Sequence, residues 1–232
     1  MKLQEELRKI KATMIMLGEN VTSGELDEIN VDQNMYPKFN LAVFKNLETF
    51  NKRTQYCNAT LKRLGSGSSR TVYQIDLGSV LKLAKNKYGL QQNRLESDAY
   101  SDNHFNEIRT NVLDYDKINY EWIVSEIATK ITPFMFKEYT GFTLKKVDGY
   151  LNLKYAENNG GKITDEDYYR YMTPAEKETM DNSDFIMKIV EFMHNNGLAA
   201  GDLGRISSWG IVKRDRDERV VLIDYGFTGK YD

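Results

Sequence analysis

A turn with two glycines is the first feature of this sequence that could bind a ligand. Residues 64–73 read Leu-Gly-Ser-Gly-Ser-Ser-Arg-Thr-Val-Tyr, with glycine at positions 65 and 67. Glycine has no Cβ atom, so the backbone amides of such a turn can approach the oxygens of a phosphate group. Because glycine and serine are also common in ordinary hairpins, the turn predicts phosphate binding only together with other suitable residues.

A lysine and a glutamate follow the turn in the sequence. Lys82 lies in the strand-like apolar run 80–83, and Glu96 lies in the helical stretch 90–100. A charge within an apolar run must either reach the wet edge of a sheet or meet an anion. We therefore interpret Glu96 as the partner of Lys82, with a surface glutamate as the alternative.

Two aspartates stand at the edges of apolar segments. Asp202 lies within Gly-Asp-Leu at 201–203, and Asp224 directly follows the apolar run 220–223. Carboxylates in such positions can hold Mg²⁺ or accept a proton from an attacking hydroxyl. An aspartate that caps a turn explains either residue alone equally well.

Taken in order, these residues resemble the protein kinase superfamily, with its glycine loop, strand lysine, helix glutamate, catalytic-loop aspartate and metal-binding aspartate. The similar motifs are G-x-G-x-x-G-x-V at Gly65, Gly67 and Val72, V-A-I-K at 80–82, H-R-D-L at 201–203 and D-F-G at 224–226. The resemblance covers residues 59–230. It implies an α+β, two-lobed protein-kinase-like fold with an antiparallel-sheet N-lobe and a truncated helical C-lobe.

The resemblance also implies ATP and Mg²⁺ as cofactors. The residues that it assigns to the nucleotide are Gly65, Gly67, Ser68, Val72, Lys82, Glu126 and Ala128. Among these, Val72 would lie above the adenine, Lys82 would contact the α- and β-phosphates, and residues 126–128 would form the hinge that binds the base. The resemblance assigns catalysis to Asp202, Lys82 and Glu96, with Asp202 orienting the acceptor hydroxyl, and it assigns the metal to Asp224 and Ser207.

The sequence departs from the family pattern in three respects. Arg70 replaces the third glycine, which makes the loop stiffer, and Ala200 and Gly201 replace the His and Arg of H-R-D. The segment 206–210 reads Ile-Ser-Ser-Trp-Gly where the family has a metal-binding Asn, so the hydroxyl of Ser207 would have to serve. We expect metal affinity or turnover to fall as a result.

The sequence ends at Asp232, shortly after the D-F-G-like motif. We therefore expect no activation loop, no A-P-E motif and no peptide-binding helices. In this respect the chain resembles the abbreviated kinase-like proteins of tailed bacteriophages, where strings such as D-Y-G-F and W-G-I recur near the C-terminus.

Three functions follow from the resemblance. The first is an ATP- and Mg²⁺-binding kinase-like protein that transfers phosphate to a hydroxyl acceptor, on a protein, with impaired activity. The alternative is a catalytically inactive pseudokinase that acts as a scaffold or as an interaction protein in a phage virion or its assembly. A third, weaker hypothesis is transfer of a nucleotidyl group on the same fold.

The elements that position these residues belong to one domain, 41–232, with an N-lobe at 41–128 and a reduced C-lobe at 129–232. Before it, we expect residues 1–18 to form an amphipathic helix, because apolar residues recur there at steps of four and three, and residues 19–40 to form a polar, acidic linker. The helix either packs on its own domain or docks a protein partner.

Within the domain, hydrophobic periodicity and turn residues predict the following elements. Helices are expected at 41–57, at 90–100, and from the capping residues 173–176 to the stop at 195–197; strands are expected at 60–64, 71–76, 79–84, 111–115, 120–128, 211–212 and 220–223, the last two separated by a charged turn at 213–219. Strands in the first half and helices in the second favour an α+β fold with two lobes.

Composition excludes several classes of protein. The net charge of −2 gives no general attraction to nucleic acid or to an anionic membrane, and we expect neither partner. No apolar run approaches the roughly 20 residues that cross a bilayer. One cysteine and two histidines exclude an internal disulfide and argue against a zinc site. We expect a cytoplasmic protein, in the host cytoplasm or the virion if a phage encodes it.

Overall fold

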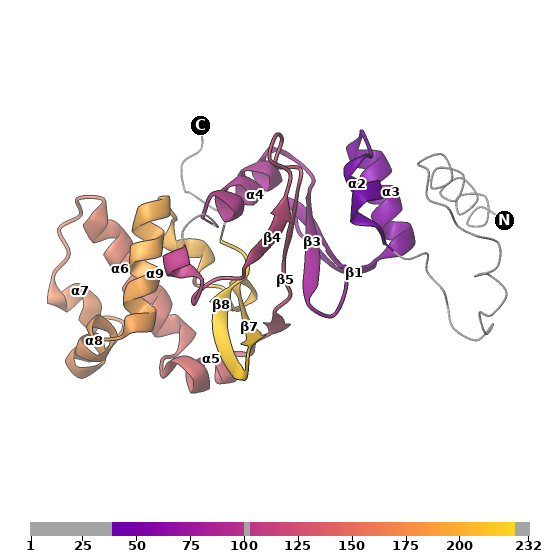
Figure 1. The fold of residues 1–232 in the computed structure, drawn as a ribbon. Helices are drawn as coiled ribbons and strands as arrows, with labels where there is room; N and C mark the ends of the chain where they lie inside the picture. Colours follow the sequence, from indigo (N-terminus) through magenta and orange to yellow (C-terminus); the bar gives the residue numbers. More distant parts are fainter. Residues whose placement is uncertain (1–38, 100–102, 226–232) are drawn as a thin grey trace, which may run out of the picture.

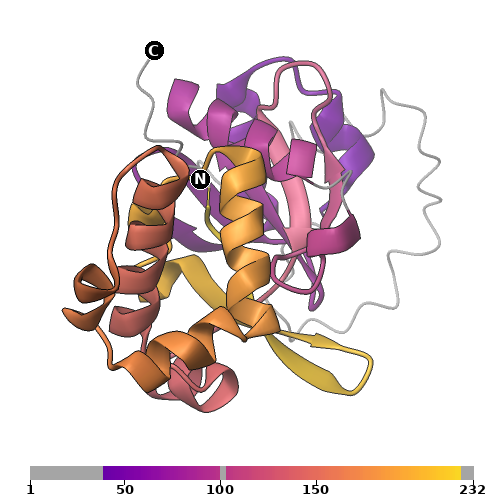
Figure 2. The same ribbon diagram turned by 90° about the vertical axis from the view of Figure 1, so that its left-hand side faces the viewer.

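The structure is a computed structural model, and it describes residues 39–99 and 103–225 (Figure 1). The predicted helix 1–18, most of the predicted linker 19–40, and Gly226 of the D-F-G-like motif lie outside these residues. The described chain forms two lobes, which Figure 2 shows from the side of the helical one. We call residues up to 128 the sheet lobe and residues from 129 onward the helical lobe.

The sheet lobe contains a five-stranded antiparallel sheet in the order β1-β2-β3-β5-β4. Its strands are β1 (Lys62–Ser66), β2 (Arg70–Gln74), β3 (Ser79–Ala84), β4 (Val112–Tyr115) and β5 (Trp122–Glu126). Three helices accompany the sheet: α2 (Leu41–Lys45), α3 (Phe50–Thr60) and α4 (Lys87–Ala99). Because successive side chains of a strand point to opposite faces, each of these strands has one row for each side of the sheet.

The two faces of the sheet have different partners. One row of side chains, including Tyr73, Leu81 and Leu83, forms a single apolar cluster with residues of α2 and α3. The alternate row starts at Arg70 in β2 and includes Val72, and in β3 it includes Lys82. Helix α4 contacts β3 and β5, and Figure 1 shows it on the side of the sheet away from α2 and α3. The strand period therefore turns both Arg70 and Lys82 away from the apolar cluster.

The helical lobe combines five α-helices with a three-stranded antiparallel sheet in the order β6-β7-β8. Its elements are β6 (Thr129–Lys130), α5 (Pro133–Thr140), α6 (Leu144–Asn158), α7 (Asp165–Tyr169), α8 (Pro174–Asp181), α9 (Asp184–Asn196), β7 (Trp209–Arg214) and β8 (Asp217–Leu222), with two short 3-10 helices, η2 (Ala200–Asp202) and η3 (Ile206–Ser208). One large apolar cluster, with Tyr150, Phe192 and Trp209 among its buried side chains, holds the helices to the strands.

Strand β8 also connects the two lobes. The amide of Leu222 donates to the carbonyl of Ile108 at 2.8 Å, and the amide of Thr110 donates to the carbonyl of Leu222 at 3.1 Å. Residues 108–110 lead into β4 of the sheet lobe. This short parallel bridge fixes the end of β8, and with it the start of the segment that carries Asp224, against the sheet lobe.

The predicted α+β class, with an antiparallel-sheet lobe followed by a helical lobe, is confirmed. Three predictions of elements were wrong. The helix expected at 41–57 is two helices, because α2 ends at Lys45 and Thr49 caps α3 by accepting from the amide of Lys52. The helix expected from 173 to 197 is two helices, because α8 ends at Asp181 and Ser183 caps α9 by accepting from the amide of Ile186. The charged turn expected at 213–219 is mostly strand, with Asp215 at φ 56° in the tight turn.

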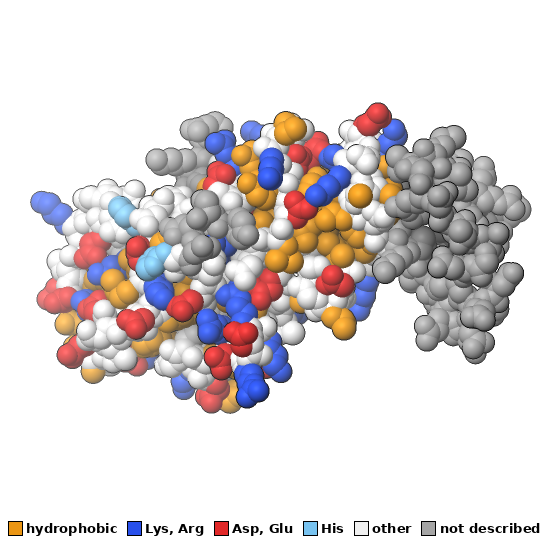
Figure 3. All heavy atoms as spheres, in the orientation of Figure 1, with side chains coloured by type: hydrophobic (Ala, Val, Ile, Leu, Met, Phe, Trp, Pro, Cys, Tyr) orange, Lys and Arg blue, Asp and Glu red, His pale blue; other side chains and the backbone are white. Residues whose placement is uncertain are grey.

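Among residues 39–99 and 103–225, no helix combines the length and the apolar character needed to span a bilayer. Figure 3 shows charged side chains of both signs interspersed over the visible face of the helical lobe.

Candidate functional site

A cavity of about 270 Å³ lies between the glycine turn, the end of β5, and the segment that follows β8. Eight of the residues singled out from the sequence line it, namely Gly65, Gly67, Val72, Lys82, Glu126, Ala128, Ser207 and Asp224. The lining does not include Ser68, Glu96 or Asp202. Residues up to 160 positions apart in the sequence thus meet around one cavity.

Lys82 and Glu96 form a buried ion pair in the wall of this cavity. The Lys82 Nζ atom lies 2.6 Å from Glu96 Oε2, and their side chains are 6% and 1% exposed. The predicted pairing of these two residues is therefore present. Burial alone would raise the pKa of Glu96, but the charges of Arg70 and Lys82 hold it below its ordinary value, so the carboxylate stays ionised.

Lys82 makes a second contact that ties β3 to the end of β8. Its Nζ atom donates to the backbone carbonyl of Ile223 at 2.7 Å. Ile223 directly precedes Asp224, so the lysine lies next to the first residue of the D-F-G-like motif. The strand position places this ammonium group between the two lobes.

Arg70 is the site residue that the sequence analysis missed. Its guanidinium lies 2.7 Å from Glu96 Oε1 through Nη1 and 2.6 Å from Asp224 Oδ1 through Nη2. We expected Arg70 only to stiffen the loop in place of glycine, but its side chain is 6% exposed and points into the site. The signal was its position at the start of a strand, two residues before Val72 and hence in the same row.

The glycine turn is tied down by hydrogen bonds. The amide of Gly67 donates to the carbonyl of Arg70 at 2.9 Å, so it is already used inside the turn. Lys85 Nζ donates to the carbonyl of Gly67 at 2.7 Å, and Asn86 Nδ2 donates to that of Ser68 at 3.0 Å. A Cβ added at Gly65 would meet nothing within 4 Å, although this residue lines the cavity. The turn thus leaves space beside Gly65.

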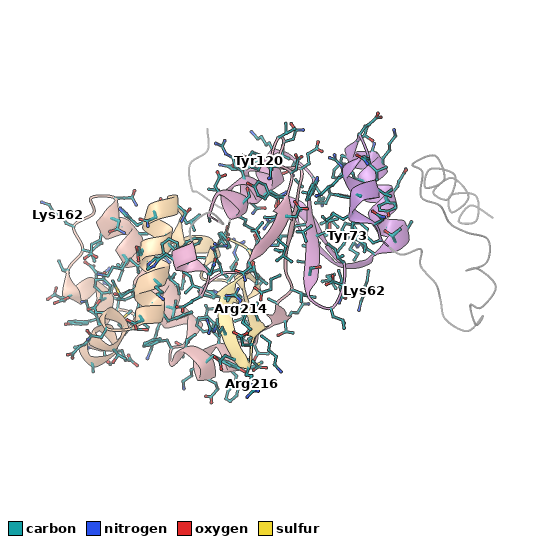
Figure 4. The ribbon with its side chains drawn as sticks, in the orientation of Figure 1. Lys62, Tyr73, Tyr120, Lys162, Arg214 and Arg216 are labelled. Carbon is teal, nitrogen blue, oxygen red and sulfur yellow. The ribbon has the colours of Figure 1, made fainter. Side chains whose placement is uncertain are left out.

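The end of β5 forms another wall of the cavity. The carboxylate of Glu126 pairs with Arg214 of β7, with Nη2 2.6 Å from Oε2. The amide of Glu126 donates to the carbonyl of Asn111 and that of Ile127 to the carbonyl of Gly78. Figure 4 labels Arg214 on the β7–β8 hairpin, with Arg216 farther out on it. The side chain of Glu126 therefore holds the second sheet to the end of β5.

Asp202 and Asp224 approach each other from separate segments. Asp202 ends η2, and its side chain is 22% exposed. Burial raises the pKa of Asp202, the charge of Arg205 opposes this effect, and the charge of Asp224 adds to it. Arg205 Nη1 lies 3.5 Å from Asp202 Oδ1. Arg205 and Asp224 thus act on the Asp202 carboxylate in opposite directions.

Ser207 and Asp224 both line the cavity, next to the end of the β7–β8 ladder. Trp209 is opposite Leu222 in the register, and the amide of Ile223 donates to the carbonyl of Ser208 at 2.9 Å. Ser207 precedes Ser208 in η3, and Asp224 follows Ile223. The Asp224 side chain is 54% exposed, which leaves it accessible.

Asp224 and Ser207 could bind one Mg²⁺ ion whose other ligands are phosphate oxygens and water. In the described part of the chain, no group of three or more His, Cys, Asp or Glu side chains is arranged to hold a metal. Protein sites for Mg²⁺ commonly supply only one or two carboxylates and leave the remaining positions to phosphate oxygens and water. Asp224 with the hydroxyl of Ser207 meets that requirement, provided that Asp224 can leave Arg70.

Comparisons with known proteins give structural neighbours but no family. No protein-family model matches the chain, and no curated protein matches it in sequence. SAICAR synthase from Saccharomyces cerevisiae is 12% identical, over 74% of this chain and 78% of that one, with a TM-score of 0.31.

Two aminoglycoside phosphotransferases are also similar. APH(2")-IIa, in a complex with streptomycin and ATP, is 14% identical over 72% of this chain and 67% of that one, with a TM-score of 0.29. ADP-bound APH(2'')-Ib is 13% identical over 78% of this chain and 73% of that one, also with a TM-score of 0.29. These TM-scores and identities are too low to transfer a function to this chain, so its function is inferred from its own side chains.

Proposed function

We propose that this protein binds ATP with Mg²⁺ in the cavity between its lobes and transfers the terminal phosphate to a hydroxyl group. The observation that carries this proposal is the buried Lys82–Glu96 pair in the wall of a cavity that the glycine turn and Asp224 also line. Keeping two charges at 6% and 1% exposure is costly unless they are paired and used. A polyanionic ligand bound beside Lys82 would interact with its ammonium group, which explains why a charged pair is buried at this place.

In this proposal each wall of the cavity binds a different part of the nucleotide. The base lies between Val72 and the backbone of Glu126 and Ala128, and the amides of Glu126 and Ile127 are already used by the carbonyls of Asn111 and Gly78. The phosphates lie along Gly65 toward Lys82. Asp224 and Ser207 would hold Mg²⁺, which when bound neutralises charge that develops on the phosphates.

Asp202 is the residue we assign to the acceptor. It would accept a hydrogen bond from the attacking hydroxyl and orient its oxygen toward the terminal phosphate. The raised pKa of Asp202 makes its carboxylate a better proton acceptor than an ordinary aspartate. We propose that the acceptor hydroxyl is on a protein.

Nucleotide binding is tested by the thermal unfolding midpoint in millimolar ATP with and without Mg²⁺. The wild type should gain several degrees, in line with the stabilisation of about 2.7 kcal/mol expected when the ligand is at 100 times its Kd. Lys82→Met should abolish the gain, and the matched control Lys62→Met, at an exposed position of β1, should keep it. A gain that Lys82→Met retains would refute the proposed pocket.

Transfer is tested separately with γ-labelled ATP, either on the protein itself or on an added protein. Asp202→Asn should lower the rate of transfer by about 100-fold or more, the usual contribution of a positioned base, while nucleotide binding persists. Product mass separates phosphate transfer from nucleotidyl transfer. Binding without any transfer would reject the enzyme and leave only the nucleotide site.

A second function, an inactive scaffold, is favoured by one specific observation. Asp224 is engaged by Arg70, and Ser207 stands in place of the family's second metal ligand. A pseudokinase would use the domain as a platform, with residues 1–18 docking a protein partner. Deleting residues 1–18 should then abolish association with that partner and leave the melting temperature nearly unchanged. A role in phage assembly or a virion remains a prediction from the sequence.

A further inference from the structure

Arg70 joins three separate elements of the molecule. It belongs to β2, and its guanidinium contacts Glu96 of α4 and Asp224 after β8, at 2.7 Å and 2.6 Å. Nη1 also donates to Oδ1 of Asn93 at 3.3 Å. Two parts of the chain that lie 154 residues apart are thus connected by one side chain. An arginine suits this position because its planar fork presents donors to two carboxylates at once.

The two contacts of Arg70 differ in burial. Glu96 is 1% exposed and also bound by Lys82, whereas the side chain of Asp224 is 54% exposed. Breaking the inner contact would leave a buried charge poorly compensated, which is costly. Breaking the outer contact only returns a half-exposed carboxylate to water, which costs little. The Asp224 end is therefore the end that can open.

The segment that carries Asp224 is fixed by the sheet lobe on both sides of the Ile223–Asp224 peptide bond. Lys82 donates to the carbonyl of Ile223, and Arg70 holds the carboxylate of Asp224. If Arg70 releases Asp224, Lys82 still keeps the backbone in place. The carboxylate can then change partner without displacement of its segment.

We propose that Arg70 gates Asp224: it holds the carboxylate of Asp224 in the free protein and must release it before Asp224 can bind a metal–nucleotide complex. This proposal rests on the nucleotide site proposed above. The guanidinium of Arg70 competes with the metal ion for the carboxylate of Asp224. The affinity of the protein for the metal–nucleotide complex is therefore lower than it would be without Arg70. The released guanidinium remains anchored to Glu96 at the side of the cavity.

The contact itself can be tested without any nucleotide. Arg70→Gln removes the charge, and Arg70→Lys keeps it but cannot reach both carboxylates with its single ammonium group. Arg63→Gln is the matched control, since Arg63 is exposed on β1 of the same hairpin and lies outside the cavity. The ¹³C chemical shift of the Asp224 carboxyl group should differ from the wild-type value in both Arg70 variants and stay unchanged in Arg63→Gln, because the contact is made by the side chain of Asp224. An unchanged shift in both Arg70 variants would overturn the contact.

The gating is tested by titrating a fluorescent ATP analogue at increasing Mg²⁺ concentrations. We expect both Arg70 variants to bind the analogue about fivefold more tightly in Mg²⁺ than the wild type, as loss of a competing half-exposed ion pair predicts, with Arg63→Gln unchanged. Equal or weaker binding by both Arg70 variants would overturn the gate while leaving the nucleotide site intact. If no form binds the analogue, the proposed nucleotide site fails and the gate with it, whether or not the Asp224 carboxyl shift changes. If Arg70→Gln fails to fold, Arg70→Lys alone is used for both the test of the contact and the nucleotide titration.

Discussion

The sheet lobe buries its charged residues at the cavity, whereas the helical lobe leaves its own accessible to water. Arg70, Lys82 and Glu96 have side chains no more than 6% exposed, and Asp202 and Asp224 are 22% and 54% exposed. On the first side each charge has a partner of opposite sign within 2.7 Å. On the second side the ion pair of Asp202 with Arg205 is 3.5 Å long.

The difference in burial suits the two sides of the cavity to different tasks, ligand binding on the sheet-lobe side and phosphate transfer on the helical-lobe side. A buried, fully paired network is set before a ligand arrives, so it can bind one without reorganising. Accessible carboxylates are free to exchange partners. Two departures from the kinase pattern, at Gly201 and Ser207, lie in the helical lobe, and the third, Arg70, belongs to the buried network. We therefore expect substitutions on the sheet-lobe side to change stability and substitutions on the other side to change transfer.

The largest effect should come from Glu96→Gln. It leaves the ammonium of Lys82 and the guanidinium of Arg70 without their shared buried carboxylate, and loss of one member of a buried ion pair typically costs about 3–5 kcal/mol. Urea unfolding measures the change. Asp98→Asn on the exposed side of α4 is the control, and it should change the free energy of unfolding by less than about 1 kcal/mol.

The effect of Glu96→Gln should also depend on pH. The pKa of Glu96 is lowered in the folded protein, so its carboxylate contributes stability above the ordinary value of 4.5 and loses it as pH falls through the lowered pKa. The wild type and the variant should therefore converge in acid. A difference that stays constant down to the acid transition would show that Glu96 does not stabilise the fold through its charge.

An intermediate effect is expected where the two lobes meet at a glycine. A Cβ at Gly210 of β7 would lie 2.8 Å from Ala128 Cβ and 3.0 Å from the carbonyl of Thr129, so Gly210→Ala forces β7 away from Ala128 and the start of β6. Overpacking of this kind costs about 1–3 kcal/mol. Thermal unfolding measures the loss, which should be accompanied by weaker nucleotide binding because Ala128 lines the cavity.

Gly65→Ala makes the opposite test at the same cavity. Its new Cβ would meet nothing within 4 Å, so the free energy of unfolding should change by no more than about 0.5 kcal/mol. Nucleotide binding should weaken, because the methyl group takes space proposed for phosphate. If both alanine variants behave alike, the distinction between packing and ligand space at these glycines is wrong.

The sheet lobe was the more predictable half from sequence because its signals are local. Alternation of apolar residues and glycine turns located β2 and β3 closely, and Lys82 and Glu96 are only 14 residues apart. The contact of Arg70 with Asp224 spans 154 residues. Alternation along β2 places Arg70 in the same row as Val72, but no local pattern specifies the distant residue that it meets. The motif resemblance brought Asp224 to the cavity, but it could not supply a contact absent from the family pattern.

The β7–β8 hairpin shows a different limit. Its charged residues predicted a long turn, yet they pair across two strands, with Lys213 opposite Glu218 and Arg214 opposite Asp217. The backbone ladder forms although the sequence pattern is that of a loop, and the ion pair of Arg214 with Glu126 at 2.6 Å ties it to the sheet lobe. Only the two-residue turn that contains Asp215 needs special backbone geometry.

The smallest effect should be on the helical-lobe side, from Arg205→Gln. The Arg205 side chain is 71% exposed, so water and salt screen its charge and its influence on Asp202 is weak. Because that charge opposes the upward effects of burial and of Asp224, its removal should raise the pKa of Asp202 further. Carboxyl NMR titration of isotope-labelled aspartate measures this pKa without any need for activity. Arg216→Gln is the control, on the far part of the β7–β8 hairpin.

Two further titrations make the sign of this effect decisive. In 1 M salt, where the screening length falls to about 3 Å, the difference between Arg205→Gln and the wild type should shrink. Asp224→Asn should lower the pKa of Asp202, because it removes a like charge. If Asp224→Asn leaves the pKa of Asp202 unchanged, the two carboxylates do not share a site. The separate roles proposed for them would then be wrong, whereas the buried ion pairs of the sheet lobe would be unaffected.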